Sequence, residues 1–178
     1  MKKILSMILA LSLVLSLAAC GGNAAEPTTE AAVSVDATCE ELVNSIIEKQ
    51  PVEFMGGIMP VDLTDTSEDG LWNIKYNTGL DSAEGLTDAA VFGPMMGSIA
   101  FSMVMVRTAE GTDVKAVAEG MKNGIDPRKW ICVEADDVQV VSFGDVVMLI
   151  MVDSTSGLTS QSFVDAFAQV CGGSVTTY

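Results

Sequence analysis

Clustered carboxylates are the first residues of this sequence whose types and spacing could do chemistry. Asp62, Asp65, Glu68 and Asp69 lie together in DLTDTSEDG. Hard carboxylate oxygens in a loop could hold Ca²⁺, but the EF-hand pattern of alternating acids, a central Gly and a late Glu is missing. Asp65 and Glu68 also fit the start of a helix, where acidic side chains cap backbone N–H groups. We therefore favour helix capping over calcium binding.

A second acidic cluster is Glu134, Asp136 and Asp137 in CVEADDVQV. Paired carboxylates can act as acid and base when their environments separate their pKa values. This cluster leads into a predicted hairpin, so we interpret it as a solvated surface. A carboxylate- or metal-dependent hydrolase nevertheless remains an alternative, and it would need two acids in one concave pocket.

The sequence contains no histidine, which excludes Ser-His-Asp and Cys-His catalysis and removes the commonest zinc ligand. Besides Cys20 there are Cys39, Cys132 and Cys171. These three could form at most one internal disulfide, and whether two of them pair stays open. Their spacing matches no zinc motif, so we expect small buried apolar side chains. No cofactor and no metal are expected.

Methionine is the remaining soft ligand, because thioethers bind Cu(I). Alternation places Met103 and Met105 on one sheet face, and Met148 and Met151 on opposite faces. Core filling therefore explains these residues, and the pair Met95-Met96, better than a copper site.

The net charge is −15. Nucleic-acid binding needs many Lys and Arg side chains to neutralise phosphates, so we expect no nucleic-acid partner. Arg107, Arg128 and Lys129 are too scattered for a phosphate site. Acidity by itself is typical of a soluble surface, and it also fits a cationic partner.

The first residues have the pattern of a bacterial lipoprotein signal. Lys2 and Lys3 precede an apolar run, residues 4–17, that is short for a transmembrane helix. It ends in Leu-Ala-Ala-Cys, the lipobox pattern in which Cys20 receives diacylglycerol. We predict a signal peptide over residues 1–19, a lipidated Cys20 carrying long acyl chains such as palmitate, and a flexible tether over residues 20–35. A plain secretory signal is the alternative. The expected location is the extracytoplasmic face of the cell membrane, without a transmembrane helix.

Residues 36–178 are expected to form one α+β domain. Thr38 and Glu41 form a capping box that predicts a helix up to Gln50. The stretch VEFMGGIMPVDLTD reads as a loop or a short extended piece, and a short helix through Trp72 and Tyr76 follows it. Two hairpins, each followed by an amphipathic helix, are predicted over residues 88–107 and 138–153.

These two hairpin-and-helix segments are similar in pattern, as SMVMVRTAEGTDVKAVAEGM and VMLIMVDSTSGLTSQSFVDAF show. We therefore predict a tandem ββα repeat. It would form a two-layer fold with a four-stranded, mainly antiparallel sheet, its helices packed on one face and an N-terminal helical extension.

The order IAFSMVMVR, charged helix, D-P-x-x-W, VQVVSFGDVVMLIMV and final helix resembles a group of lipoproteins from low-GC Gram-positive gut bacteria. They are known as domain of unknown function 4358. The resemblance covers roughly residues 39–170 and places Gly144 in the hairpin turn. The segment from Asp126 to Trp130 departs from the longer Tyr/Pro segment of similar chains. The resemblance implies membrane anchoring and no functional residues.

Trp72, Tyr76 and Trp130 are the candidate ligand-binding residues. We expect a small-molecule or peptide groove near them, on the sheet face that the helices leave uncovered; core packing of the three rings is the alternative. The first functional hypothesis is thus a membrane-anchored binding or interaction module. The carboxylate hydrolase and a structural component of an envelope complex are the others.

Overall fold

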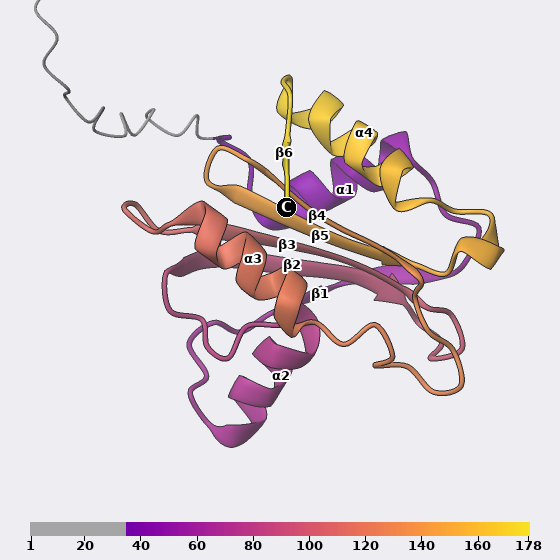
Figure 1. Ribbon diagram of the computed structural model, residues 1–178, viewed down its shortest axis with the longest axis horizontal. Helices are drawn as coiled ribbons and strands as arrows, with labels where there is room; N and C mark the ends of the chain where they lie inside the picture. The colour runs from indigo at the N-terminus through magenta and orange to yellow at the C-terminus, as the bar shows by residue number, and fades with distance from the viewer. Residues whose placement is uncertain (1–34) are drawn as a thin grey trace, which may run out of the picture. The chain divides into compact units, whose positions relative to one another are not determined.

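Four α-helices and one antiparallel sheet make up residues 35–178, the part of the chain that the computed structural model describes (Figure 1). Cys20, the predicted signal peptide and nearly all of the predicted tether lie outside these residues. The elements are α1 (Cys39–Lys49), β1 (Gly56–Pro60), α2 (Glu68–Thr78), β2 (Leu86–Pro94), β3 (Phe101–Thr108), α3 (Val114–Gly124), β4 (Asp137–Phe143), β5 (Val146–Val152), a 3₁₀ turn (Ser154–Ser156), α4 (Ser160–Cys171) and β6 (Thr176–Thr177).

The helices begin where short side chains satisfy the free N–H groups of their first turns. At α1, the Glu41 N–H donates to Thr38 Oγ1 at 3.2 Å, and the Thr38 N–H donates to Glu41 Oε2 at 2.8 Å. This confirms the predicted capping box, a motif that satisfies two helix-end donors at once. At α2 the Ser67 hydroxyl accepts the Gly70 N–H, and at α3 the Asp113 carboxylate accepts the N–H groups of Lys115 and Ala116, without a reciprocal bond.

The sheet has the order β1-β2-β3-β5-β4-β6, with antiparallel neighbours throughout. Both predicted hairpins are confirmed, and β3 and β5 pair at the centre with Val104 opposite Leu149. Every residue of β5 is buried, as expected for a strand covered on both faces. The predicted four-stranded sheet is wrong, because β1 and β6 extend it to six strands. Gly56, Gly57 and Pro60 give β1 a weak strand signal.

Helices cover both faces of the sheet. α1 and α4 pack with Met103, Met148 and Ile150 on one face, whereas α3 and Ile74 of α2 pack with Val104 and Leu149 on the other (Figure 1). The expected two-layer arrangement, with helices on one face and a separate N-terminal helical extension, is therefore wrong. The alternating strands present apolar side chains on both sides, so both sides need a helical cover. Within residues 35–178, none of the helices combines the length and apolarity needed to cross a membrane.

The tandem repeat is not confirmed, although hairpin, helix, hairpin and helix follow one another along the chain. In a repeat of this kind, a two-fold axis perpendicular to the sheet would relate the two hairpins. The same axis would place α3 and α4 on the same face of the sheet. Instead, α3 joins the parallel strands β3 and β4, and α4 joins the parallel strands β5 and β6. Both crossovers move two strands in the same direction along the sheet, but their starting strands, β3 and β5, run antiparallel to each other. If both crossovers have the usual right-handed sense, their helices must lie on opposite faces of the sheet.

Candidate binding site

Helix α2 carries two of the predicted aromatic residues one turn apart. Trp72 and Tyr76 are separated by four positions, which places both rings on one side of a helix. The rings stack with centroids 4.9 Å apart and planes inclined by 21°. Trp72 is 63% exposed, whereas Tyr76 is half-buried. The alternative that Trp72 is a core residue is therefore wrong.

The ends of α2 and α3 meet through two glycines, and this contact sets the path of the loop that follows α3. Gly79 ends α2 with φ +82°, a conformation that glycine adopts without strain. A Cβ atom on Gly124 would lie 2.0 Å from the Gly79 carbonyl oxygen, so only glycine allows this approach. The loop is then closed by a hydrogen bond from the Ala135 N–H to the Pro127 carbonyl, 2.9 Å long.

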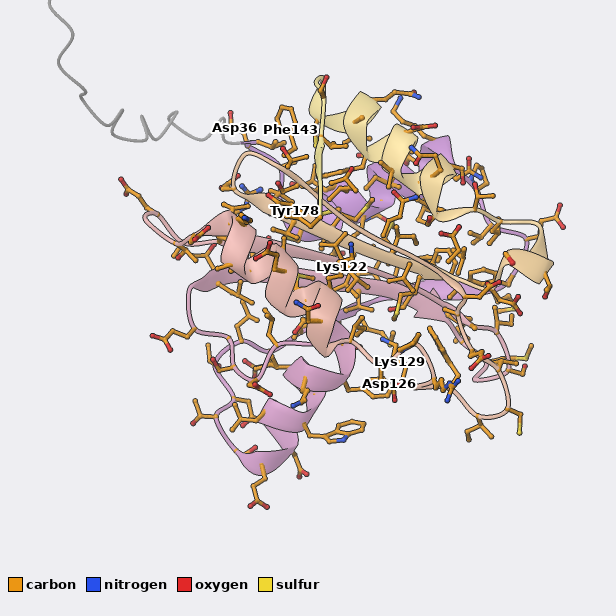
Figure 2. The ribbon with its side chains drawn as sticks, viewed as in Figure 1. Asp36, Lys122, Asp126, Lys129, Phe143 and Tyr178 are labelled. Carbon is orange, nitrogen blue, oxygen red and sulfur yellow. The ribbon has the colours of Figure 1, made fainter. Side chains whose placement is uncertain are left out.

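This loop brings Lys129 and Trp130 against α2. The Lys129 ammonium donates to the Tyr76 carbonyl and to Ser102 Oγ, each at 3.2 Å. It lies 4.9 Å from the centroid of the Tyr76 ring and 5.4 Å from that of Trp130. Figure 2 shows Lys129 with Asp126 on the loop that follows α3. The Tyr76 and Trp130 rings thus flank the lysine, and Trp72 joins them through its stack on Tyr76. We name Trp72, Tyr76, Lys129 and Trp130 the aromatic–lysine cluster.

The ammonium of Lys129 has no carboxylate partner within hydrogen-bond distance among the described residues. Burial lowers its pKa to about 8, and the charge of nearby Asp126 opposes this shift only in part. The Tyr76 carbonyl belongs to the last turn of α2, where the helix dipole favours a cation. At neutral pH the cluster therefore holds a half-buried positive charge between two aromatic rings, an arrangement that cation–π attraction stabilises.

The expectation of a groove on an uncovered sheet face is wrong, because α2 and α3 cover the sheet face beside which these residues lie. The cluster is a surface formed by α2 and the loop after α3. Sequence reasoning missed Lys129, which it grouped with scattered basic residues. The available signal was its position directly before Trp130 and after the Asp-Pro helix break.

The acidic clusters do not converge on a common site. Asp62 Oδ1 accepts hydrogen bonds from the Thr64 N–H and hydroxyl at 2.8 and 2.7 Å, and Asp65 Oδ1 accepts one from the Ser67 N–H at 2.9 Å. These bonds lower the pKa of both carboxyl groups. The expectation that Asp65 caps the helix is therefore wrong: Ser67 is the capping residue of α2, and Asp65 accepts the N–H of Ser67 in the turn before it.

The second acidic cluster is dispersed in the same way. Glu134 pairs with Arg128 at 2.7 Å, and the Asp136 carboxylate accepts bonds from the Ser154 N–H and hydroxyl at 2.7 and 2.6 Å. Asp137 accepts bonds from Ser160 at the start of α4. Within residues 35–178, no three His, Cys, Asp or Glu side chains lie close enough together to hold a metal ion.

The sulfur-containing residues divide into core and surface. Met103, Met105 and Met148 are fully buried on one sheet face, and Met151 on the other, as alternation predicts. Met95 and Met96, by contrast, are 73% and 61% exposed, so core filling is wrong for this pair.

All three described cysteines are free thiols. Burial raises the pKa of Cys39 above the ordinary range, and that of Cys171 to about 11. Cys132 is exposed, so the expectation of a buried apolar side chain is wrong there.

A separate cleft of about 390 Å³ lies where the described chain enters the domain. Arg107 crosses it, pairing with Asp145 at 2.7 Å and donating to the carbonyl oxygens of Val35 and Ala37 at 2.9 and 2.5 Å. Asp88 accepts a bond from the Cys39 N–H at 2.7 Å. The carboxylates of this cleft thus bind donors of the domain itself and hold its first residues in place.

Comparison with protein-family models, with curated proteins and with solved structures finds no match to this chain.

Proposed function

We propose that this protein is a lipoprotein of the family known as domain of unknown function 4358, anchored through Cys20 at the extracytoplasmic face of the cell membrane. The support is the charged start, the apolar run and the lipobox of the sequence. Two or three acyl chains, each adding about 0.8 kcal/mol per buried CH₂, hold such a protein on a membrane without a spanning helix.

The globular domain acts as a binding module, and the exposed stack of Trp72 on Tyr76 is the observation that carries this proposal. A large indole that remains 63% exposed while a neighbouring ring fixes its orientation is preorganised for contact. Binding then buries apolar area without ordering a flexible side chain. Lys129 holds the stack against the sheet through its bonds to Tyr76 and Ser102.

The surroundings of Trp72 favour a ligand with a flat or apolar cationic group. Glu68 and Asp69 lie one turn before Trp72 on α2, and both are exposed. A cation over the open indole face gains about 0.5–1 kcal/mol at an exposed site, and the neighbouring carboxylates add to this attraction.

A titration with benzyltrimethylammonium, followed by NMR, tests this surface. We expect saturable shifts of the Trp72 indole N–H, and the variant Trp72→Ala should weaken binding by about two- to fivefold. The matched control is Leu71→Ala, because Leu71 is exposed on the same helix turn but lies outside the stack. Equal affinity of Trp72→Ala and the unchanged protein would contradict the proposal.

The anchor is tested by Cys20→Ser in the cells that make the protein. We expect the mass of the acyl chains to disappear and the protein to leave the membrane fraction, because a thioether-linked lipid needs the thiol. Cys132→Ser is the matched control, since it removes an exposed thiol from the domain. A Cys20→Ser protein that stays in the membrane fraction would count against the lipid anchor.

A structural role in an envelope complex is the second candidate, and exposed methionines favour it. Met55, Met59, Met95 and Met96 are between 48% and 78% exposed. Flexible thioether side chains are common at protein-binding surfaces.

A further inference from the structure

Strand β1 leaves half of its backbone hydrogen-bonding groups open at the edge of the sheet. The Met95 N–H donates to the Met55 carbonyl at 2.9 Å, and bonded and non-bonded pairs alternate along an antiparallel ladder. The N–H and C=O groups of Gly56 and Ile58 therefore point away from β2. Pro60, which has no N–H, follows on the same outer side, where proline is tolerated in a strand.

This edge carries only part of the usual protection against strand pairing. Natural edge strands are commonly shortened, bulged, or given proline or charged side chains, especially lysine. Of these devices, β1 has only its short length and Pro60 at its end. β1 has the sequence GGIMP, without a charge, and it pairs with β2 over its whole length. A Cβ atom on Gly57 would meet no atom within 4 Å, so no neighbouring side chain covers β1 at this position. At the opposite edge, β6 is only two residues long.

Exposed methionines border the open edge. Met55 and Met95 are joined by the hydrogen bond described above, and they are 78% and 73% exposed. The Met59 side chain, 48% exposed, reaches over Gly93, where its Cε lies 3.3 Å from the position of a Cβ. A strand added at this edge would thus find both backbone partners and adaptable apolar contacts.

Charge at the two ends of β1 decides between the candidate occupants. Glu53 precedes the strand and Asp62 follows it, and both are exposed. Antiparallel pairing of two copies about Ile58 would bring Glu53 of one copy beside Asp62 of the other, at both ends of the contact. Like charges across paired strands are destabilising, whereas opposite charges stabilise them.

We propose that β1 accepts an extended segment of a partner protein, with an apolar centre and a basic residue on each side, as an added strand of the sheet. The Gly56 and Ile58 backbone groups supply the hydrogen bonds, and Glu53 and Asp62 pair with the basic flanks. This inference assigns a second binding surface to the module and does not depend on a ligand at Trp72.

The test uses the lipidated protein in detergent and two synthetic peptides, RVTVTVR and its acid-flanked counterpart EVTVTVE, with binding measured by fluorescence anisotropy. We expect RVTVTVR to bind with a dissociation constant below about 1 mM, and EVTVTVE to bind at least about tenfold more weakly.

The variant Ile58→Pro removes an outward N–H and keeps every bond of the β1–β2 ladder, and the residue before it is the permissive Gly57. It should weaken RVTVTVR binding by about tenfold or more, whereas Ile58→Val and Trp72→Ala should not. Glu53→Lys should reduce the preference for basic flanks, whereas Glu48→Lys, an exposed acid of α1, should leave it unchanged.

Two results would overturn the inference even if Ile58→Pro fails to fold. One is the absence of saturable RVTVTVR binding, or equal binding of both peptides to the unchanged protein. The other is a dimer in sedimentation that Glu53→Lys strengthens, which would identify a second copy as the occupant of the edge.

Discussion

Replacing Arg107 by leucine should lower the free energy of unfolding by about 2–4 kcal/mol, the largest loss expected from one surface-proximal charge in this domain. The side chains of Arg107 and Asp145 are only 16% and 22% exposed. Removing the guanidinium takes the cation away from the half-buried Asp145 carboxylate. The Oδ1 atom of this carboxylate already accepts no hydrogen bond from the described residues, so little would remain to compensate its charge. It also releases the carbonyl oxygens of Val35 and Ala37. Urea unfolding, with the slope checked for constancy, measures the loss.

The matched control is Arg128→Leu. Arg128 pairs with Glu134 at the same 2.7 Å distance, but the two side chains are 76% and 59% exposed. An exposed ion pair contributes about 0–1 kcal/mol, so this variant should unfold close to the unchanged protein. Arg107→Lys should fall between the two, because an ammonium cannot match the planar donor fork. Similar losses for Arg107→Leu and Arg128→Leu would show that the cleft does not hold the first residues of the domain.

The helices and the central hairpins were predictable because local signals and tertiary packing agree there. In α3, Val117, Ala118 and Met121 recur at helical spacing, and all three pack on the sheet. Strands β3 and β5 are apolar at nearly every position, which indicates a central place in the sheet. In such segments, short-range pattern and long-range burial require the same structure.

The edges and the layers were not predictable from these local signals. Gly56, Gly57 and Pro60 favour loops, and only pairing with β2 makes β1 a strand. Strand β6 is short, and it is held by contacts of Tyr178, whose N–H donates to the Val140 carbonyl and whose hydroxyl bonds Ser142 Oγ. Its backbone oxygen also accepts a bond from Lys122 of α3 (Figure 2). Which face each helix covers depended on the order of the strands, and hydrophobic periodicity does not encode that order.

The candidate site was predictable in part, for a similar reason. The spacing of Trp72 and Tyr76 indicates two neighbouring rings once the helix is recognised. Lys129 lies far from them in the sequence, and its place between the Tyr76 and Trp130 rings depends on how α2 and α3 meet at Gly79 and Gly124. A half-buried lysine with neutral hydrogen-bond partners leaves no signature in composition or charge pattern.

Half-buried Lys129 should make the protein more stable as the pH rises above 8. Its pKa is about 8 in the folded protein and 10.5 when exposed, so between these values the unfolded chain binds more protons. The free energy of unfolding then rises with pH, by up to about 3 kcal/mol over the whole window, because each pKa unit corresponds to 1.36 kcal/mol. Below pH 8 the ammonium is charged in both states, and its contribution no longer changes.

The buried thiols act in the opposite direction and must be separated from this effect. The pKa values of Cys39 and Cys171 are raised above 9.0 by burial, so their stabilising contribution is present below pH 9 and is lost as the pH rises further. Both thiols remain in Lys129→Met, a variant of similar length without the charge. Their contribution therefore cancels in the difference between the unchanged protein and this variant.

The decisive measurement is that difference in the free energy of unfolding, taken from pH 7 to pH 10.5 by urea unfolding. It should rise by about 2–3 kcal/mol in favour of the unchanged protein, most steeply near pH 9, midway between the two pKa values. Lys75→Met gives the baseline, because Lys75 is an exposed lysine of the same helix-and-loop region. A difference that stays constant with pH would mean that the ammonium of Lys129 is solvated in solution. The aromatic–lysine cluster would then not be the fixed support that the stack of Trp72 on Tyr76 requires.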